Sequence, residues 1–384
     1  MSFSLYIHIP YCQSKCPYCD FNSYAASSWP EADYTGALIA EMRNRATTSP
    51  WVGRRIKTIF FGGGTPSLFA PDSISSMIES ADRLFGIEDG AEITLEANPG
   101  TVNRSNLLGF RAAGVNRLSF GAQSFDSATL SFLGRIHGPD ETRAAARLAH
   151  RAGFERFNLD LIFAVPGQQV EDVRKDIAEA AALAPDHISA YNLTFEEGTA
   201  FFAEMRRGRI RPLATEEQAV MYDVVRSELP QRGYPMYEIS NYAPAGHEAR
   251  HNLSYWRAES YLGLGAGAHS CALDRALCNA RRWWNARLPG RYIEGVSGDG
   301  MAEAGFELIE KITLEAEFVF LNLRLRRGFL VAEFAERFGE GFDARFGSVA
   351  RSLVEGGLLV RERGRIFLTD RGLEIADSVF AEFL

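Results

Sequence analysis

Three cysteines near the start of the chain have the type and spacing needed to hold a metal centre from one loop. Cys12, Cys16 and Cys19 form a C-x3-C-x2-C pattern that contains Pro17. A structural zinc site uses four protein ligands, and no fourth ligand is evident here. An iron–sulfur cluster held by three thiolates instead keeps one iron open to an outside ligand. We therefore predict an iron–sulfur centre, with a zinc site and ordinary buried cysteines as the alternatives.

Three glycines in succession form a second feature. Gly62, Gly63 and Gly64, followed by Thr65, end the apolar segment 56–61, which is typical of a buried strand. Glycine has no Cβ, so such a run lets the backbone approach a ligand closely. Glycine-rich turns also end many ordinary strands, and this run alone does not decide between the two.

The segments that must position these residues alternate along the chain between short apolar strands and amphipathic helices. Strands are predicted near 5–9, 56–61, 92–96, 117–121, 157–163 and 187–193, with helices near 34–45, 71–84, 104–113, 141–151 and 170–183. This alternation requires a parallel sheet with helical crossovers. Six units are too few for an eight-fold barrel. We predict an α/β fold in which residues 1–240 form a partial (β/α)6 barrel, with function gathered at the C-terminal ends of its strands.

The rest of the chain has a different pattern. Residues 241–300 form a predicted connecting segment that contains an H-N-x-x-Y-W motif, and its part 242–267 has no clear periodicity. From about residue 303 we expect helices with a short hairpin at 358–361 and 366–368, an order typical of an α+β, winged-helix-like domain over 301–384. Such domains often bind DNA, but the fold does not confer the function.

Several segments together resemble a known family. The cysteine spacing resembles the signature of radical S-adenosylmethionine (SAM) proteins. The longer segments resemble the oxygen-independent coproporphyrinogen III oxidase family, and within it a branch of haem chaperones. The segments that carry the resemblance are 6–10, 95–99, 119–125, 133–137, 158–163 and 251–256. The resemblance implies a radical-SAM barrel with a [4Fe-4S] cluster on the three cysteines and with SAM on the open iron.

The resemblance also implies which residues meet SAM. They are Tyr6, Tyr18, Gly63, Gly64, Thr65, Glu96, Gln123, Arg135 and Asp160. SAM carries an ammonium, a carboxylate, a ribose diol and a sulfonium, so a site for it needs acceptors, donors and a cation together. Carboxylates can accept from ammonium or hydroxyl groups, and an arginine can hold a carboxylate as a planar fork. Each charged residue alone could equally be a solvated surface residue.

The H-N-x-x-Y-W motif starts at His251 and bears on haem. The resemblance associates this motif with haem binding, and a neutral imidazole is the usual proximal ligand of haem iron. A hydrogen-bonded histidine beside a core tryptophan is the alternative. His247, His269 and Cys271 are weaker candidates, and His269 could face the SAM cleft.

Two departures from the oxidase pattern bear on activity. Phe21 stands where the oxidases have a fourth cysteine, and their long N-terminal extension has no counterpart before Tyr6. We therefore carry two hypotheses. The first is a haem chaperone that binds a cluster, SAM and haem and passes haem to an acceptor protein. The second is a radical-SAM oxidase that decarboxylates coproporphyrinogen. Both imply a haem or porphyrin partner and an electron donor such as a flavodoxin or ferredoxin.

The amino-acid composition limits the other classes of function that the protein could have. The chain has 384 residues, 46% of them hydrophobic, and a net charge of −8. This charge is the opposite of the basic face expected of a protein that binds nucleic acid phosphates, so we expect no nucleic acid partner.

No apolar run reaches the roughly 20 residues that span a bilayer. Five cysteines, three of them clustered, favour a reducing compartment, and we predict a cytoplasmic protein.

Overall fold

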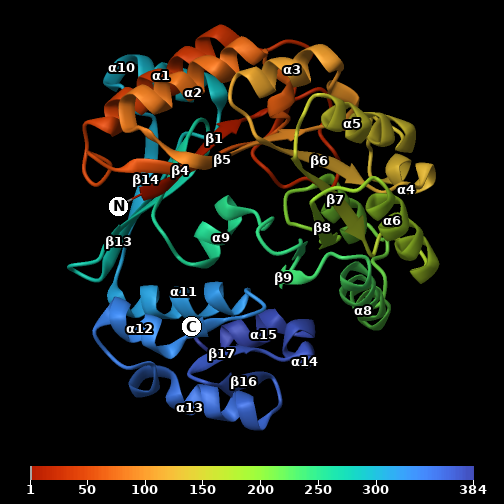
Figure 1. Ribbon diagram of the computed structural model, residues 1–384, viewed down its shortest axis with the longest axis vertical. Coiled ribbons are helices and arrows are strands. Elements are labelled where there is room, and N and C mark those ends of the chain that lie inside the picture. The colour runs from red at the N-terminus through yellow and green to blue at the C-terminus, as the bar shows by residue number, and fades with distance from the viewer. Residues whose placement is uncertain (1) are drawn as a thin grey trace.

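The computed structural model describes residues 2–384, and its largest element is one twelve-stranded sheet that curves around a central space (Figure 1). The strand order is β14-β13-β12-β11-β1-β4-β5-β6-β7-β8-β10-β9. From β11 to β8 every neighbouring pair is parallel. The two ends of the sheet do not pair with each other, so the fold is a partial barrel, as the sequence predicts.

All six predicted strands are present. They are β1 (Ser2–Ile9), β4 (Arg55–Gly63), β5 (Ile87–Ala97), β6 (Arg117–Gln123), β7 (Arg156–Phe163) and β8 (His187–Asn192). The helices between them pack on the outer face. They are α1 (Glu31–Ala46), α2 (Pro71–Phe85), α3 (Arg104–Ala112), α4 (Ser127–Phe132), α5 (Pro139–Arg151) and α6 (Val170–Ala182). Short elements precede three of these helices: β2 (Tyr11–Cys12) and β3 (Tyr24–Ala25) come before α1, η1 (Pro66–Leu68) before α2, and η2 (Pro99–Thr101) before α3.

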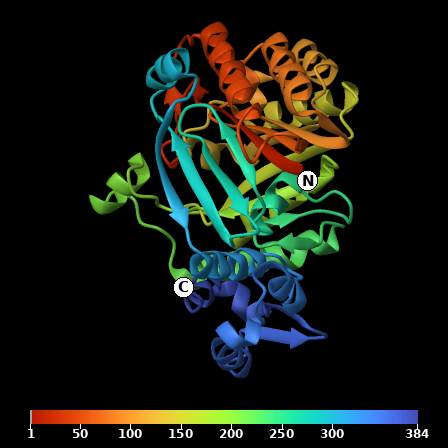
Figure 2. The same cartoon turned by 90° about the vertical axis from the view of Figure 1, so that its left-hand side faces the viewer.

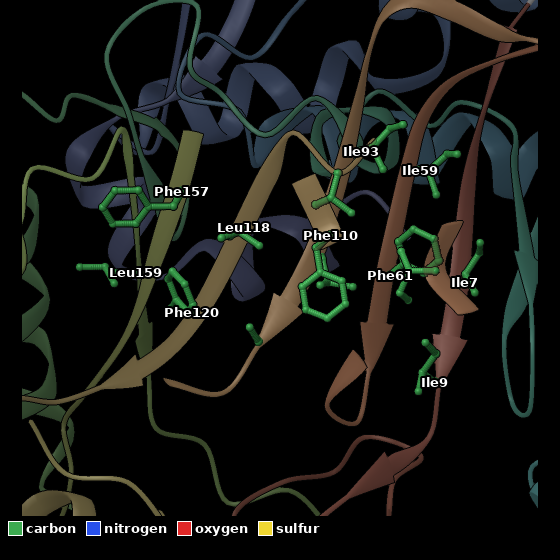
Figure 3. Close-up of a cluster of buried hydrophobic side chains, with 14 of the residues drawn as sticks. Ile7, Ile9, Ile59, Phe61, Ile93, Phe110, Leu118, Phe120, Phe157 and Leu159 are labelled. Carbon is green, nitrogen blue, oxygen red and sulfur yellow. The ribbon is translucent and has the colours of Figure 1, made fainter. Parts of the chain in front are cut away.

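Apolar and polar side chains alternate along the strands, so one face of this sheet is apolar and the other is polar. On β6, Leu118 and Phe120 are buried beneath the helices, whereas Ser119 between them lines the central space. Figure 3 shows labelled apolar side chains from β1, β4, β5, β6 and β7 forming one continuous cluster with Phe110 of α3. Because successive strand residues point to opposite faces, the polar residues of the same strands face the central space.

The sheet is larger than the sequence predicts. Residues that we assigned to an irregular connecting segment form β11 (Tyr261–Leu264), β12 (His269–Asp274) and β13 (Asn279–Asn285), and β11 pairs with β1. The expectation of helix from about residue 303 is wrong at its start, since β14 (Glu303–Ile309) pairs with β13. Between β8 and β11 lie α7 (Ala200–Arg206), α8 (Thr215–Gln231), β9 (Met236–Glu238), β10 (Asn241–Tyr242) and α9 (Arg250–Trp256), and α10 (Pro289–Asp299) follows β13.

The C-terminal part has its own core and the predicted winged-helix-like order. Figure 2 shows it below the teal strands of the main sheet. Its elements are α11 (Lys311–Leu323), β15 (Phe329–Leu330), α12 (Val331–Phe338), α13 (Phe342–Glu355), β16 (Leu359–Glu362), β17 (Arg365–Leu368), α14 (Asp370–Glu374) and α15 (Ala376–Ala381). Its three strands pair in the order β15-β17-β16. In residues 2–384 every helix is too short or too polar to cross a membrane.

Candidate functional site

The cysteine loop begins at the C-terminal end of β1, and three hydrogen bonds hold it there, two from within the loop and one from α7. The Lys15 ammonium donates to the carbonyls of Phe21 (3.0 Å) and Ser23 (3.1 Å) within the loop. The Phe201 N–H of α7 donates to the Pro17 carbonyl at 2.9 Å. These hydrogen bonds tie the backbone of the loop to itself and to α7.

Two of the three thiols also contact predicted SAM residues. Thr65 Oγ1 donates to Cys12 Sγ at 3.5 Å, and Arg135 Nη1 donates to Cys16 Sγ at 3.4 Å. Burial raises the pKa values of the Cys12 and Cys19 thiols. A metal centre, or cationic donors such as Arg135, favours the thiolate form that metal binding requires.

The cysteine loop offers three thiols, and the histidine nearest to it in sequence does not complete a four-ligand site. Among the described residues, no three His, Cys, Asp or Glu side chains come close enough to hold one metal ion. His8 is the histidine nearest to the loop in sequence. Its ring nitrogens lie 2.9 Å from the Tyr6 hydroxyl and 2.9 Å from the Asn22 carbonyl, so it does not supply a fourth ligand. Cys12, Cys16 and Cys19 are thus the residues that would hold the predicted [4Fe-4S] cluster.

A cavity of about 230 Å³ lies in the central space of the partial barrel, and we call it the lumen cavity. Four of the predicted SAM residues line it: Tyr6, Gly63, Glu96 and Asp160. Glu96 and Asp160 lie within β5 and β7, rather than after these strands as the sequence pattern suggested. They reach the cavity because they face the inner side of the sheet.

The two carboxyl groups of the lumen cavity influence each other. Burial, and then the charge of Asp160, raises the pKa of Glu96 from 4.5 to about 8, against the lowering effect of the Gly63 N–H. That N–H donates to Glu96 Oε2 at 3.2 Å. Burial also raises the pKa of Asp160, although Asn158 (2.8 Å) and Ser119 (3.1 Å) donate to its oxygens. Such a pair is suited to a ligand that carries positive charge.

The remaining predicted SAM residues lie outside the lining of the lumen cavity. Arg135 Nη2 donates to the Gly121 carbonyl at 2.9 Å, so this side chain joins β6 to the cysteine loop. Gln123 ends β6 with a φ of 66°, a conformation that is uncommon for a residue with a side chain. Tyr18 packs on Phe201 with ring centroids 6.3 Å apart. Thr65 and Gly64 follow β4 beside the start of the cysteine loop.

The glycine run is required by the packing of the chain itself. A Cβ on Gly63, whose φ is 111°, would lie 2.3 Å from the His8 ring. A Cβ on Gly64 would lie 2.6 Å from the Tyr11 carbonyl oxygen. The sequence suggested that these glycines let a ligand come close. The structure gives a second reason, since β1 and the cysteine loop already occupy the space.

We expect Gly63→Ala to lower the free energy of unfolding by about 2–5 kcal/mol, because it combines overpacking with a strained left-handed φ. Gly36→Ala is the matched control. Gly36 lies in α1 with nothing within 4 Å of its Cβ position, so alanine there should stabilise by about 0.5–1 kcal/mol. Urea denaturation measures both changes. Equal midpoints for Gly63→Ala and the wild type would contradict this account.

His251 lies on α9 and is deeply buried, with 1% of its surface exposed. Its Nδ1 is 2.9 Å from Thr58 Oγ1, and its Nε2 is 3.0 Å from the Tyr255 hydroxyl. Burial, and then the charges of Lys57 and Arg117, lowers its pKa to about 3. The ring is therefore neutral, but both of its nitrogens are engaged within the protein. A role of His251 in haem binding stays a prediction.

Several polar residues of the lumen cavity were not predicted from the sequence. They are Arg117, Ser119, Asn158, His187, Ser189 and Tyr191. Asn158 Oδ1 lies 2.7 Å from His187 Nδ1, which ties β7 to β8 at this face. The signal was present in the strands themselves, since polar residues alternate with buried apolar ones on β6 and β7.

Comparisons with known proteins agree with this geometry. The model of the radical SAM superfamily matches residues 6–180, and the model of the HemN C-terminal domain matches residues 309–375. The heme chaperone HemW of Bacillus subtilis is 37% identical over 99% of this chain and 99% of its own length. This chain belongs to the HemW family. The HemW of Escherichia coli is 40% identical over 76% of this chain and 77% of its own.

A solved structure shows the same fold over the full length. Coproporphyrinogen III oxidase (HemN) from Escherichia coli, described as a radical SAM enzyme, matches with a TM-score of 0.84 over 100% of this chain and 90% of its own. The sequence identity is 23%, so the match shows the fold alone. The family membership therefore rests on the HemW relatives and the fold on both comparisons.

Proposed function

We propose that this protein is a haem chaperone with a radical-SAM core. In this proposal Cys12, Cys16 and Cys19 hold a [4Fe-4S] cluster, and the lumen cavity holds SAM between Glu96 and Asp160. The observation that carries the proposal is that Thr65, directly after β4, and Arg135, bound to β6, each donate to a thiol of the cysteine loop. The names of the HemW relatives supply the haem and the chaperone role.

The residues of the chain would perform distinct tasks. Such a cluster supplies a low-potential electron and an open iron for SAM when it is bound. Arg135 places a fixed positive charge beside the Cys16 sulfur. The carboxyl groups of the lumen cavity would pair with the positive charges of SAM and accept hydrogen bonds from its hydroxyl groups.

The same proposal includes an electron donor such as a flavodoxin or ferredoxin, a haem-acceptor protein and a cytoplasmic location.

The alternative is oxidation of coproporphyrinogen, and Phe21 argues against it. This side chain is 61% exposed at the position where the oxidases have their fourth cysteine. We expect the reconstituted protein to bind haem and to pass it to a haem-free acceptor without releasing carbon dioxide from coproporphyrinogen. An anaerobic assay with SAM and reductant, run beside a haem titration, tests both activities. Formation of protoporphyrinogen, or the absence of haem binding, would overturn the proposal.

A further inference from the structure

A second cavity, of about 620 Å³, lies beside the cysteine loop, and we call it the flank cavity. It shares Tyr6 and Phe21 with the lumen cavity. The flank cavity is the larger of the two, and its volume falls within the range of about 300–1,000 Å³ that is common for ligand-binding cavities. Nothing described so far assigns a role to the flank cavity.

One wall of the flank cavity carries an exposed histidine without a polar partner. His269 starts β12, and neither of its ring nitrogens hydrogen-bonds to a described residue. Its ring stacks on Trp284, the residue opposite it on β13, with centroids 5.8 Å apart and planes at 29°. Partial burial, and then the charges of Arg282 and Arg287, lowers the pKa of His269 and so favours its neutral form. A neutral imidazole with a free nitrogen can coordinate a metal.

The other histidines near the flank cavity lack this freedom. His8 lines the cavity, but its ring nitrogens are engaged by Tyr6 and the Asn22 carbonyl, and it is 5% exposed. His251 lies outside the lining, with its ring nitrogens engaged by Thr58 and Tyr255. His269 is therefore the histidine whose ring is both oriented and open to the cavity.

We propose that the flank cavity binds haem, with the imidazole of His269 as an axial ligand and Arg287 as the partner of a haem propionate. This inference rests on the proposed function, because the haem itself comes from that proposal. It deepens the proposal by naming the cavity, the ligand and the residue that recognises the propionate. The cavity adjoins the cysteine loop, so bound haem would lie beside the predicted cluster.

The other walls of the flank cavity suit a flat macrocycle with acidic substituents. Phe21 offers an exposed aromatic face, and Tyr255 packs edge-on against Tyr261 with centroids 4.8 Å apart. Arg287 is exposed and forms no ion pair with a described carboxylate, which leaves its charge available. Asp20, also in the lining, would repel a propionate and so favour the orientation toward Arg287.

The same arrangement gives the H-N-x-x-Y-W motif a role that does not require iron ligation. The His251 ring holds the Tyr255 hydroxyl at 3.0 Å, and Tyr255 forms part of the wall of the flank cavity. His251 is then a positioning residue for that wall. Its replacement should alter the fit of haem while leaving an imidazole on the iron.

The test is a haem titration of the full chain followed by absorbance and electron paramagnetic resonance spectra. We expect His269→Ala to lose the spectra of histidine-ligated haem, and we expect added free imidazole to restore them. His251→Ala should keep these spectra. His150→Ala is the matched control, because His150 is an exposed histidine on α5, far from the cavity lining.

Arg287→Ala supplies a second measurement that does not depend on the iron ligand. It should weaken binding of haem about two- to fivefold, as for one solvent-exposed ion pair. It should leave binding of haem dimethyl ester unchanged, because the ester has no propionate charge. Equal losses for both compounds would remove Arg287 from the inference.

The outcomes separate this inference from the proposed function. If the wild type binds no haem, the proposed function fails and the inference fails with it. If the wild type binds haem and the His269→Ala spectra match those of the wild type, the inference is overturned and the proposed function stands. Loss of the spectra in His251→Ala alone would move the axial ligand to the motif histidine.

Discussion

Alanine in place of Cys12, Cys16 or Cys19 is expected to abolish the brown colour and the iron–sulfur absorbance of anaerobically reconstituted protein. Each thiol would supply one of only three protein ligands, so no neighbouring group can replace it. Iron and sulfide analysis, together with absorbance spectra, measures the loss. Cys278→Ala is the control, because the Cys278 thiol donates only to backbone carbonyls of Arg275 and Arg337.

Two results would contradict the cluster assignment. One is a variant in the cysteine loop that keeps four irons and four sulfides per chain. The other is wild-type protein that, prepared without oxygen, carries one tightly bound zinc ion and no iron. Either result would also remove the electron source that the proposed SAM chemistry requires.

Removing a carboxylate from the lumen cavity should weaken SAM binding and leave the cluster in place. We expect Glu96→Gln and Asp160→Asn each to cost roughly 1.5–3 kcal/mol, or about 10- to 150-fold in affinity, because each removes a carboxyl group that can pair as a carboxylate with a cationic ligand. Equilibrium dialysis with labelled SAM measures the change. Glu171→Gln, which removes an exposed carboxylate from α6, is the control. Unchanged binding in both cavity variants would show that these residues do not meet SAM.

The raised pKa of Glu96 gives this prediction a pH dependence. With a pKa of about 8, the Glu96 carboxyl is mostly protonated at pH 7 in the protein without ligand. A cationic ligand prefers the carboxylate, so its binding releases a proton. SAM affinity should therefore rise as the pH approaches about 8 and level off above it. The rise should be absent in Glu96→Gln, and an equal rise in that variant would assign it to another group.

The same shift affects the stability of the protein without ligand. Glu96 takes up a proton more strongly in the folded chain, with a pKa of about 8, than at its ordinary value of 4.5. Its contribution to stability is fully present below pH 4.5 and is lost as the pH rises through about 8. A bound cation would offset this loss, which links the stability of the barrel to its ligand.

The pattern of residues within short segments was enough to predict the barrel strands and the cysteine loop. The six strands were recognisable because short apolar runs recur between amphipathic helices, and each run is local in sequence. The three cysteines lie within one loop directly after the first strand, so their grouping needs no tertiary contact. The winged-helix-like order of the C-terminal part was also evident from local hairpin and helix signals.

The pattern of residues within short segments was not enough to predict strands whose pairing partners lie far away in the sequence. Residues 242–267 gave no clear periodicity, yet β11 within them pairs with β1 at the far end of the sequence. The buried contact between the Ser4 and Ser254 hydroxyls, 2.9 Å apart, joins the same two regions. Pairing at such separation is decided by the completed sheet and not by the residues of the strand alone.

By itself the sequence determined that this protein has a three-thiol loop on a radical-SAM barrel, because spacing and strand order are properties of the chain. The tertiary structure alone decided the surroundings of its two most informative histidines. It buries the His251 ring between Thr58 and Tyr255, and it leaves the His269 ring open beside Trp284. The partners of each ring come from other elements, and only folding brings those elements together.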